Sequence, residues 1–251
     1  MIKFFRHIRQ TLIMENKTSK YLKYAIGEIV LVVIGILIAL QVNNWNENRK
    51  AKLRKDNLLK SLQVEFEQNL DQLDSVLYYD HLVAKSSLKL LHLKSDDDIV
   101  KDIDSIRLLL QNTSWIWTFD PLNGALRSGI SSGDINLINN NRLKNLLFTW
   151  QDVVADAKEN EDRALNLRLN SKVIYQHVRN VDYRGVERTE LGKSKFDSDY
   201  EGLTNDPNFE DYISERYSHI RDAILELNLV REQNLDVLDL IKQEQSRGTN
   251  D

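Results

Sequence analysis

The chain has 251 residues with 34 basic and 38 acidic side chains, a formal net charge of −4, and no cysteine. Residues 1–44 hold six of the basic and two of the acidic side chains, which leaves the remainder with a net charge of −8. This acidic charge excludes nucleic acid as a favoured partner. The absence of cysteine is compatible with an oxidising compartment.

Residues 1–23 combine six basic side chains with apolar residues at helical spacing. Ile2, Phe5, Ile8 and Leu12 recur every three or four positions. This pattern predicts a basic amphipathic segment that lies at a membrane surface, where anionic lipid attracts the bases. The alternative is an ordinary basic flank that stays in water.

Residues 24–42, YAIGEIVLVVIGILIALQV, predict a transmembrane helix. Ten of the twelve residues at 29–40 are Ile, Leu or Val. A helix of this length spans roughly 28 Å, close to the roughly 30 Å hydrocarbon core of a bilayer. A cleavable signal peptide is the main rival, but the apolar run is too long and Ala39-Leu40-Gln41 lacks the small-x-small cleavage pattern.

Three residues of this span fall on one helix face, because Glu28, Gly35 and Ala39 are separated by seven and four positions. Small residues let membrane helices approach closely, and an intramembrane acid tends to seek a protein partner. The face predicts a homo-oligomer or a different membrane protein partner. Alternatively, Glu28 reaches the lipid headgroups as an interfacial residue.

The orientation of the span is less clearly marked, since six basic residues precede it and six follow it within residues 49–60. Long domains cross a membrane largely regardless of charge, whereas a short tail with six bases is retained in the cytoplasm. We therefore expect a cytoplasmic N-terminus, with residues 45–251 on the far side.

Residues 43–251 are predicted to form a helical, acidic soluble domain, because their apolar residues recur at steps of three and four. Helices are expected at about 46–94 and 99–111, from Asp120-Pro121 to about 129–133, from 139–141 to about 180, and from Asp206-Pro207 onward. A polar loop at about 181–205 precedes the last helix. The predicted fold class is all-α, an antiparallel bundle with long helices after an N-terminal transmembrane helix.

The sequence contains no recognisable catalytic or cofactor-binding motif, so we assign no catalytic residue and no cofactor, and we do not expect an enzyme. One loop resembles a calcium site, because Asp197, Asp199 and Glu201 occupy the first, third and fifth ligand positions. Asn208 stands where the bidentate Glu belongs. An acidic surface loop is the favoured interpretation and calcium binding the weaker one.

Trp115, Trp117 and Phe119 form an aromatic cluster in TSWIWTFDP, between two predicted helices. Packing under the loop is the favoured interpretation. The alternative is a surface for a partner or ligand, where aromatic anchors are enriched.

The segment YLKYAIGEIVLVVIGILIALQVNNWNE resembles the opening of a bacterial family of uncharacterised single-pass membrane proteins, a domain-of-unknown-function family. The resemblance is most specific over residues 1–50 and weaker over residues 131–147. It implies a membrane-anchored protein of Gram-negative bacteria without an established activity. The span would then cross the inner (plasma) membrane, with the C-terminal domain in the periplasm.

Two function classes follow from these features. The first is a membrane-anchored interaction or sensing module that binds another envelope protein. The second is a membrane-tethered enzyme whose site is assembled from scattered helical residues. A pocket where acids converge with His177 or His219 would favour the enzyme, and a closed apolar core would favour the interaction module.

Overall fold

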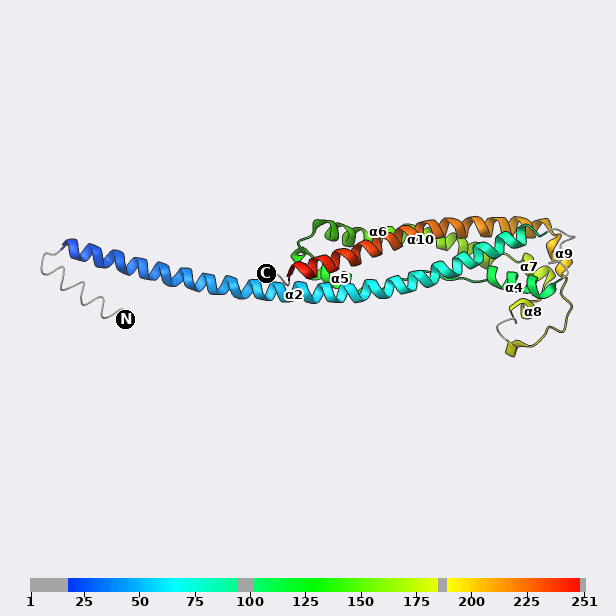
Figure 1. The fold of residues 1–251 in the computed structure, drawn as a ribbon, viewed down its shortest axis with the longest axis horizontal. Coiled ribbons are helices and arrows are strands. Elements are labelled where there is room, and N and C mark those ends of the chain that lie inside the picture. Colours follow the sequence, from blue (N-terminus) through cyan, green and yellow to red (C-terminus); the bar gives the residue numbers. More distant parts are fainter. Residues whose placement is uncertain (1–17, 94–101, 185–188, 249–251) are drawn as a thin grey trace. The chain divides into compact units, whose positions relative to one another are not determined.

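The computed structural model describes residues 18–93, 102–184 and 189–248 (Figure 1). Every regular element in these residues is helical, which confirms the predicted all-α fold class. Most of the predicted amphipathic segment 1–23 lies outside the described residues. The elements are α2 (Thr18–Leu91), α4 (Ile103–Thr113), α5 (Gly124–Ser132), the 3-10 helix η1 (Asp134–Leu137), α6 (Asn141–Asn170), α7 (Val173–His177), α8 (Asn180–Arg184), the 3-10 helix η2 (Thr189–Leu191), α9 (Tyr200–Thr204) and α10 (Pro207–Gly248).

The chain divides into two compact units, residues 1–56 and residues 57–251. The first unit contains the predicted span, and α2 is long and apolar enough there to cross a membrane by length and composition. Its apolar side chains are not covered by protein, since Ile29 and Leu31 are 63% and 64% exposed. The guanidinium of Arg49 lies 5.6 Å from the ring centre of Trp45, after the apolar stretch.

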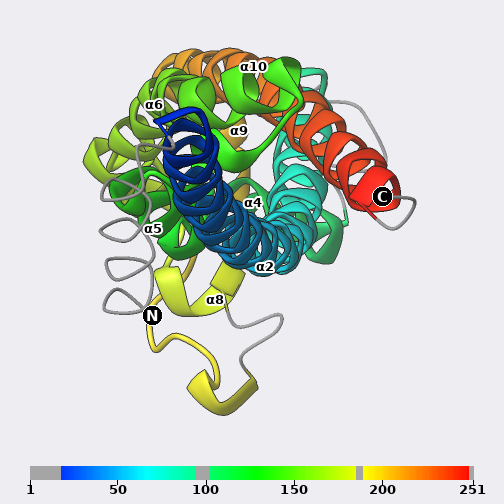
Figure 2. The same cartoon turned by 90° about the vertical axis from the view of Figure 1, so that its left-hand side faces the viewer.

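The second unit is a bundle of three long helices, the later part of α2, α6 and α10 (Figures 1 and 2). Helix α10 runs antiparallel to α6, because Gln233 donates to the Leu146 carbonyl while Arg216, earlier in α10, donates to the later Ala164 carbonyl. The ring of Phe66 in α2 lies 4.8 Å from that of Trp150 in α6. These contacts confirm antiparallel packing between long helices.

Leu, Ile, Val and Phe side chains from the three long helices form one core cluster, which also receives Trp150. A second core cluster joins the end of α2 with α4, α7, α9 and the start of α10. The apolar stripes predicted for the long helices supply most of the first cluster, including Leu59, Phe66, Leu147 and Ile220. Burial of these stripes drives the helices together.

The starts of α6 and α10 are confirmed by local capping contacts. The Asn140 side chain accepts from the Leu143 amide at 3.1 Å, and α6 begins at the next residue, Asn141. The Asp206 carboxylate accepts from the Asn208 amide at 2.8 Å as α10 begins at Pro207. Such side-chain acceptors satisfy the free amides of a first helical turn.

Two predicted boundaries are wrong. Helix α5 begins at Gly124 instead of beside Pro121, because Glu65 of α2 accepts from the amides of Ala125 and Leu126 at 2.6 and 3.0 Å. A side chain from another helix therefore caps α5. Helix α6 ends at Asn170 instead of about 180, since Ser171 adopts an extended backbone and Val173 then begins the short helix α7.

The predicted polar loop at 181–205 also contains helical turns, namely the end of α8, η2 and α9. The predicted helix 99–111 is observed as α4, with Asp102 accepting from the Ser105 amide at its start. The expected first residues of that helix, 99–101, lie outside the described residues. The long helix predicted to end at about Lys94 ends at Leu91.

Candidate functional site

A buried arginine organises the centre of the second unit. Arg216 of α10 is 1% exposed and donates from Nη2 to the Trp115 carbonyl at 2.7 Å, from Nη1 to the Ala164 carbonyl at 2.9 Å, and from Nε to the Thr113 carbonyl at 3.3 Å. A guanidinium presents its donors in a fixed planar fork. Arg216 therefore ties the last residue of α4, Thr113, and Trp115, two residues later, to α6.

The connecting segment, residues 114–123 between α4 and α5, is held by side chains from two other long helices. Glu161 of α6 accepts from the Phe119 amide at 2.8 Å. The Asn69 side chain of α2 accepts from the Leu122 amide at 2.7 Å and donates to the Leu122 carbonyl at 2.8 Å. Because the described residues contain no strand that could pair with this segment, side chains satisfy backbone groups that would otherwise be buried without partners.

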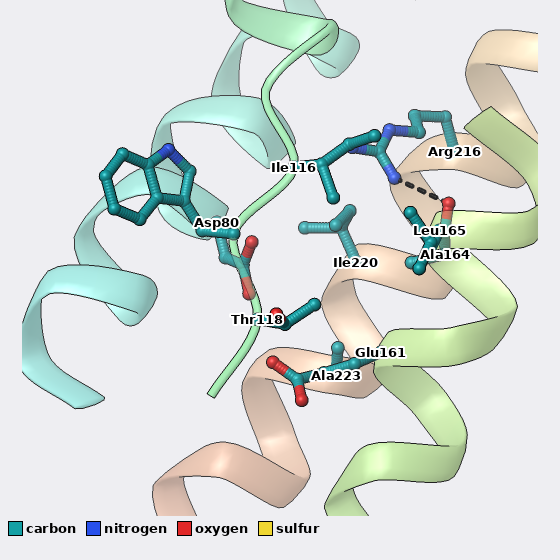
Figure 3. Close-up of a pocket in the computed structure, with 10 residues that line it drawn as sticks. Asp80, Ile116, Thr118, Glu161, Ala164, Leu165, Arg216, Ile220 and Ala223 are labelled. Atoms are coloured by element: carbon teal, nitrogen blue, oxygen red, sulfur yellow. Dashed lines mark hydrogen bonds between the residues drawn. The ribbon is translucent and has the colours of Figure 1, made fainter. Parts of the chain in front are cut away.

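Two buried acids face a small cavity beside Arg216 (Figure 3). Asp80 comes from α2 and is 3% exposed, and Glu161 comes from α6 and is 4% exposed. The cavity has about 10 Å³ of water-accessible space, which is room for about one water molecule. The cavity is lined by Asp80, Ile116, Trp117, Thr118, Glu161, Ala164, Leu165, Arg216, Ile220 and Ala223.

Asp80 has no hydrogen bond or ion pair with any residue that the structure describes. Glu161 uses one carboxylate oxygen for the Phe119 amide. The guanidinium of Arg216 donates its hydrogen bonds to backbone carbonyls, so it acts on Asp80 only at longer range. The site thus has two carboxyl groups and an arginine whose hydrogen bonds go to backbone carbonyls and not to these acids.

Burial shifts the protonation of both acids. It raises the pKa of Asp80 to about 7, with a further increase from the charge of Glu161 and an opposing effect of Arg216. Burial also raises the pKa of Glu161 to about 7, against the hydrogen bond from Phe119 and the charge of Lys158. Both carboxyl groups therefore change charge near neutral pH, a property that is common at functional sites.

The predicted aromatic cluster lies beside this cavity. Phe119 is buried in the core, whereas Trp117 is 40% exposed and lines the cavity. The rings of Trp117 and Tyr79 are stacked, with 4.3 Å between their centres and 2° between their planes. Trp115 is half-buried and packs against the core cluster. Packing accounts for Phe119 and Trp115, and the partner surface stays a prediction that concerns Trp117.

Other candidates from the sequence lie away from this cavity. In the first unit, a Cβ added at Gly35 would meet no atom within 4 Å, and the packing face of Glu28, Gly35 and Ala39 stays a prediction.

In the calcium candidate Asp197, Asp199 and Glu201, the Asp199 carboxylate instead caps α9 by accepting from the Gly202 amide at 2.7 Å. Across the described ranges, no three His, Cys, Asp or Glu side chains could hold a metal.

The histidines named with the enzyme alternative do not line the cavity of Asp80 and Glu161. His177 Nε2 lies 2.8 Å from the Asp206 carboxylate. His219 lines an open groove of about 610 Å³ between α6 and α10, together with Glu215. Asp80 and Glu161 converge on the cavity, whereas His219 lies in the groove. Neither the pocket of acids and histidine expected for an enzyme nor the closed apolar core expected for an interaction module is therefore fully present.

Sequence reasoning missed Asp80, Glu161 and Arg216, although a signal was present. Each falls where an apolar stripe continues, three residues after Leu77, four after Ala157 and three after Ile213 respectively. A charged residue at a core position is rarely buried without a specific partner or role. The position of each residue in its stripe indicated burial, but the groups that Glu161 and Arg216 contact lie far away in the sequence.

We expect the free energy of unfolding to fall as pH rises from about 5 to about 7.5, by up to about 1.4 kcal/mol per pH unit for each acid. A carboxyl group whose pKa is raised by folding binds more protons in the folded state than in the unfolded state. Its contribution to stability is therefore complete below the pKa of the unfolded state, 3.8 for Asp80 and 4.5 for Glu161, and is lost as pH rises through about 7. Urea unfolding of the full chain in detergent, followed by circular dichroism, measures this slope.

The substitution Asp80→Asn should reduce the slope and raise stability near pH 8 by about 2 kcal/mol or more, because it removes the buried charge. Asp71→Asn, at an exposed position of the same helix, is the matched control and should leave the slope unchanged. Parallel pH profiles for the parent and Asp80→Asn would show that Asp80 does not titrate in this range.

Comparison with known proteins gives a family match. Residues 28–152 match the model of a family of unknown function (DUF6090). The match includes Asp80 and the connecting segment, while Glu161 and Arg216 lie after it. No curated protein and no solved structure matches the chain. The resemblance to a domain-of-unknown-function family is thus confirmed over residues 28–152.

Proposed function

We propose that the protein is a single-pass membrane protein whose helical residues 43–251 form an interaction or sensing module, with another envelope protein as partner. The exposed apolar surface of α2 carries this proposal. Ile29, Leu31 and Ile38 are among many large apolar side chains exposed there on all sides. Exposure to water costs about 25 cal/mol for each Å² of apolar surface, whereas a bilayer covers this surface completely.

The proposed location is the inner membrane of a bacterium, with the N-terminus in the cytoplasm and residues 45–251 in the periplasm. The six bases before the span support this orientation, because a short basic tail resists translocation. Trp45 fits the headgroup region at the other end of the span, where amphipathic aromatic rings are favoured.

Two surfaces could receive a protein partner. The first is the membrane face of Gly35 and Ala39, which offers close backbone approach within lipid. The second is the exposed aromatic side chain of Trp117 together with Ile116, next to the cavity of the second unit. Exposed aromatic anchors on a rigid support are typical of binding surfaces.

A membrane-tethered enzyme is the second candidate, because Asp80 and Glu161 converge on a cavity. A pair of carboxyl groups that titrate near neutral pH is suited to general acid and base chemistry. The converging acids favour this class, whereas the exposed Trp117 beside them favours the interaction module.

The proposed topology predicts that a phosphatase active only outside the cytoplasm will be active when fused after Asp251. Membrane fractions should retain the fusion after a high-salt wash, because the span holds it by its apolar surface. Replacing Val33 and Ile36 with Arg should release it or block its export, since charges at the bilayer centre are costly. A fluorescent cytoplasmic fusion with an inactive phosphatase would reverse the orientation.

The membrane face predicts that Gly35→Ile will reduce self-association of the span by roughly tenfold, because a large side chain prevents close helix approach. A transmembrane-association reporter in bacteria measures this effect. Gly27→Ile is the control, since Gly27 also has open space around it but lies off the face of Gly35 and Ala39. Equal signals from both variants and the parent would contradict the homo-oligomer, leaving a different membrane partner to be sought.

A further inference from the structure

The Asp80–Glu161 cavity has the properties of a binding site for a positive group. We propose that it binds a primary ammonium group carried on an alkyl chain, with Asp80 and Glu161 as hydrogen-bond acceptors. This proposal goes beyond the membrane-anchored module, because it assigns a ligand class to the second unit whatever its protein partner is.

Unused acceptors are the first support. Asp80 is 3% exposed, lines the cavity, and has no hydrogen bond or ion pair with a described residue. Glu161 has one oxygen bound to the Phe119 amide, while its other oxygen has no such bond to the described part of the chain. Burying a carboxylate without a hydrogen-bond donor costs free energy. A ligand that donates to both carboxyl groups is therefore favoured by the hydrogen bonds that these groups do not make within the protein.

The number of acceptors matches the donors of an ammonium group. A primary ammonium has three N–H donors and no acceptor, as in the lysine side chain. Thr118 also lines the cavity, and its hydroxyl donates to Asp120 at 2.8 Å, which leaves its oxygen free to accept. In the view of Figure 3, Thr118 lies between the carboxyl groups of Asp80 and Glu161.

The charge of the site also favours a cation. Arg216 contributes one positive charge, but its three hydrogen bonds go to the carbonyls of Thr113, Trp115 and Ala164. With both acids ionised, the cavity therefore has one more negative than positive charge. A monovalent cation balances this group of charges, whereas an anion adds to the repulsion.

The dimensions and walls favour an ammonium group over a metal ion or a larger cation. The space of about 10 Å³ fits one water-sized group. Calcium takes about six to eight oxygen ligands, more than the two carboxyl groups and one hydroxyl provide. The exposed side chains of Ile116 and Trp117 form an apolar wall for the alkyl chain, and Trp117 is supported by its stack on Tyr79.

Titration of the full chain in detergent micelles with n-butylamine, near pH 8, tests the proposal by isothermal calorimetry. We expect saturable binding that weakens roughly tenfold to a hundredfold in Asp80→Asn and in Glu161→Gln, because each loses a charged acceptor. The Gln side chain keeps an oxygen for the Phe119 amide, so this variant retains that contact. n-Butanol, which has the same chain without the charge, should not bind.

The matched protein control is Glu159→Gln, which removes an acid of α6 whose side chain is 74% exposed. Its affinity for n-butylamine should equal that of the parent. The proposal is overturned if the parent gives no saturable heat, if the variant carrying both Asp80→Asn and Glu161→Gln binds like the parent, or if potassium chloride competes as well as the amine. None of these results bears on membrane anchoring, which the fusion and fractionation experiments test separately.

Discussion

The second unit depends on the hydrogen bonds that Arg216 donates to three backbone carbonyls. A helical bundle normally satisfies its backbone within the helices, but the connecting segment passes beside the core without a helical hydrogen-bond pattern. Its buried carbonyls and amides therefore require side-chain partners. Arg216 supplies the donors, and Glu161, with Asn69 nearer α5, supplies the acceptors. Arg216, Glu161 and Asn69 are thus explained by the backbone groups that they satisfy.

This arrangement places charge where a bundle usually has only apolar side chains. Glu161 is needed as an acceptor for Phe119, and Asp80 lies close enough for the two acids to repel each other. Arg216 carries a single positive charge and donates its hydrogen bonds to carbonyls, so it does not neutralise both acids. The result is a cavity with two carboxyl groups beside an exposed Trp117. The acceptor that the connecting segment requires, Glu161, thus lies beside Asp80 at a cavity.

The parts of the fold that follow local rules could be predicted from the sequence. The apolar steps of three and four gave the long helices, and Asn140 and Asp206 marked the starts of α6 and α10 because their side chains cap their own helices. The start of α5 could not be predicted, since its cap is Glu65, 60 residues earlier in the chain. Tertiary contacts, and not local propensity, set that boundary.

The candidate site was hidden for the same reason. Asp80, Glu161 and Arg216 interrupt apolar stripes, so the sequence could have shown that they face the core. Their roles depend on partners far along the chain, as with Arg216 and Thr113, which are 103 positions apart. A single sequence contains no information on which stripe residues meet which carbonyls. The cavity, in turn, exists only where α2, α6, α10 and the connecting segment meet.

The free energy of unfolding of Arg216→Met, measured in the full chain beside Arg221→Met at an exposed position of α10, tests this account most directly. Met fills a similar volume without donors, so the carbonyls of Thr113, Trp115 and Ala164 would each lose a hydrogen bond. We expect a loss of about 3 to 5 kcal/mol for Arg216→Met and almost none for the control. We also expect faster amide exchange in the connecting segment. An Arg216→Met protein as stable as the parent, with unchanged exchange at Phe119, would contradict the central role of this arginine.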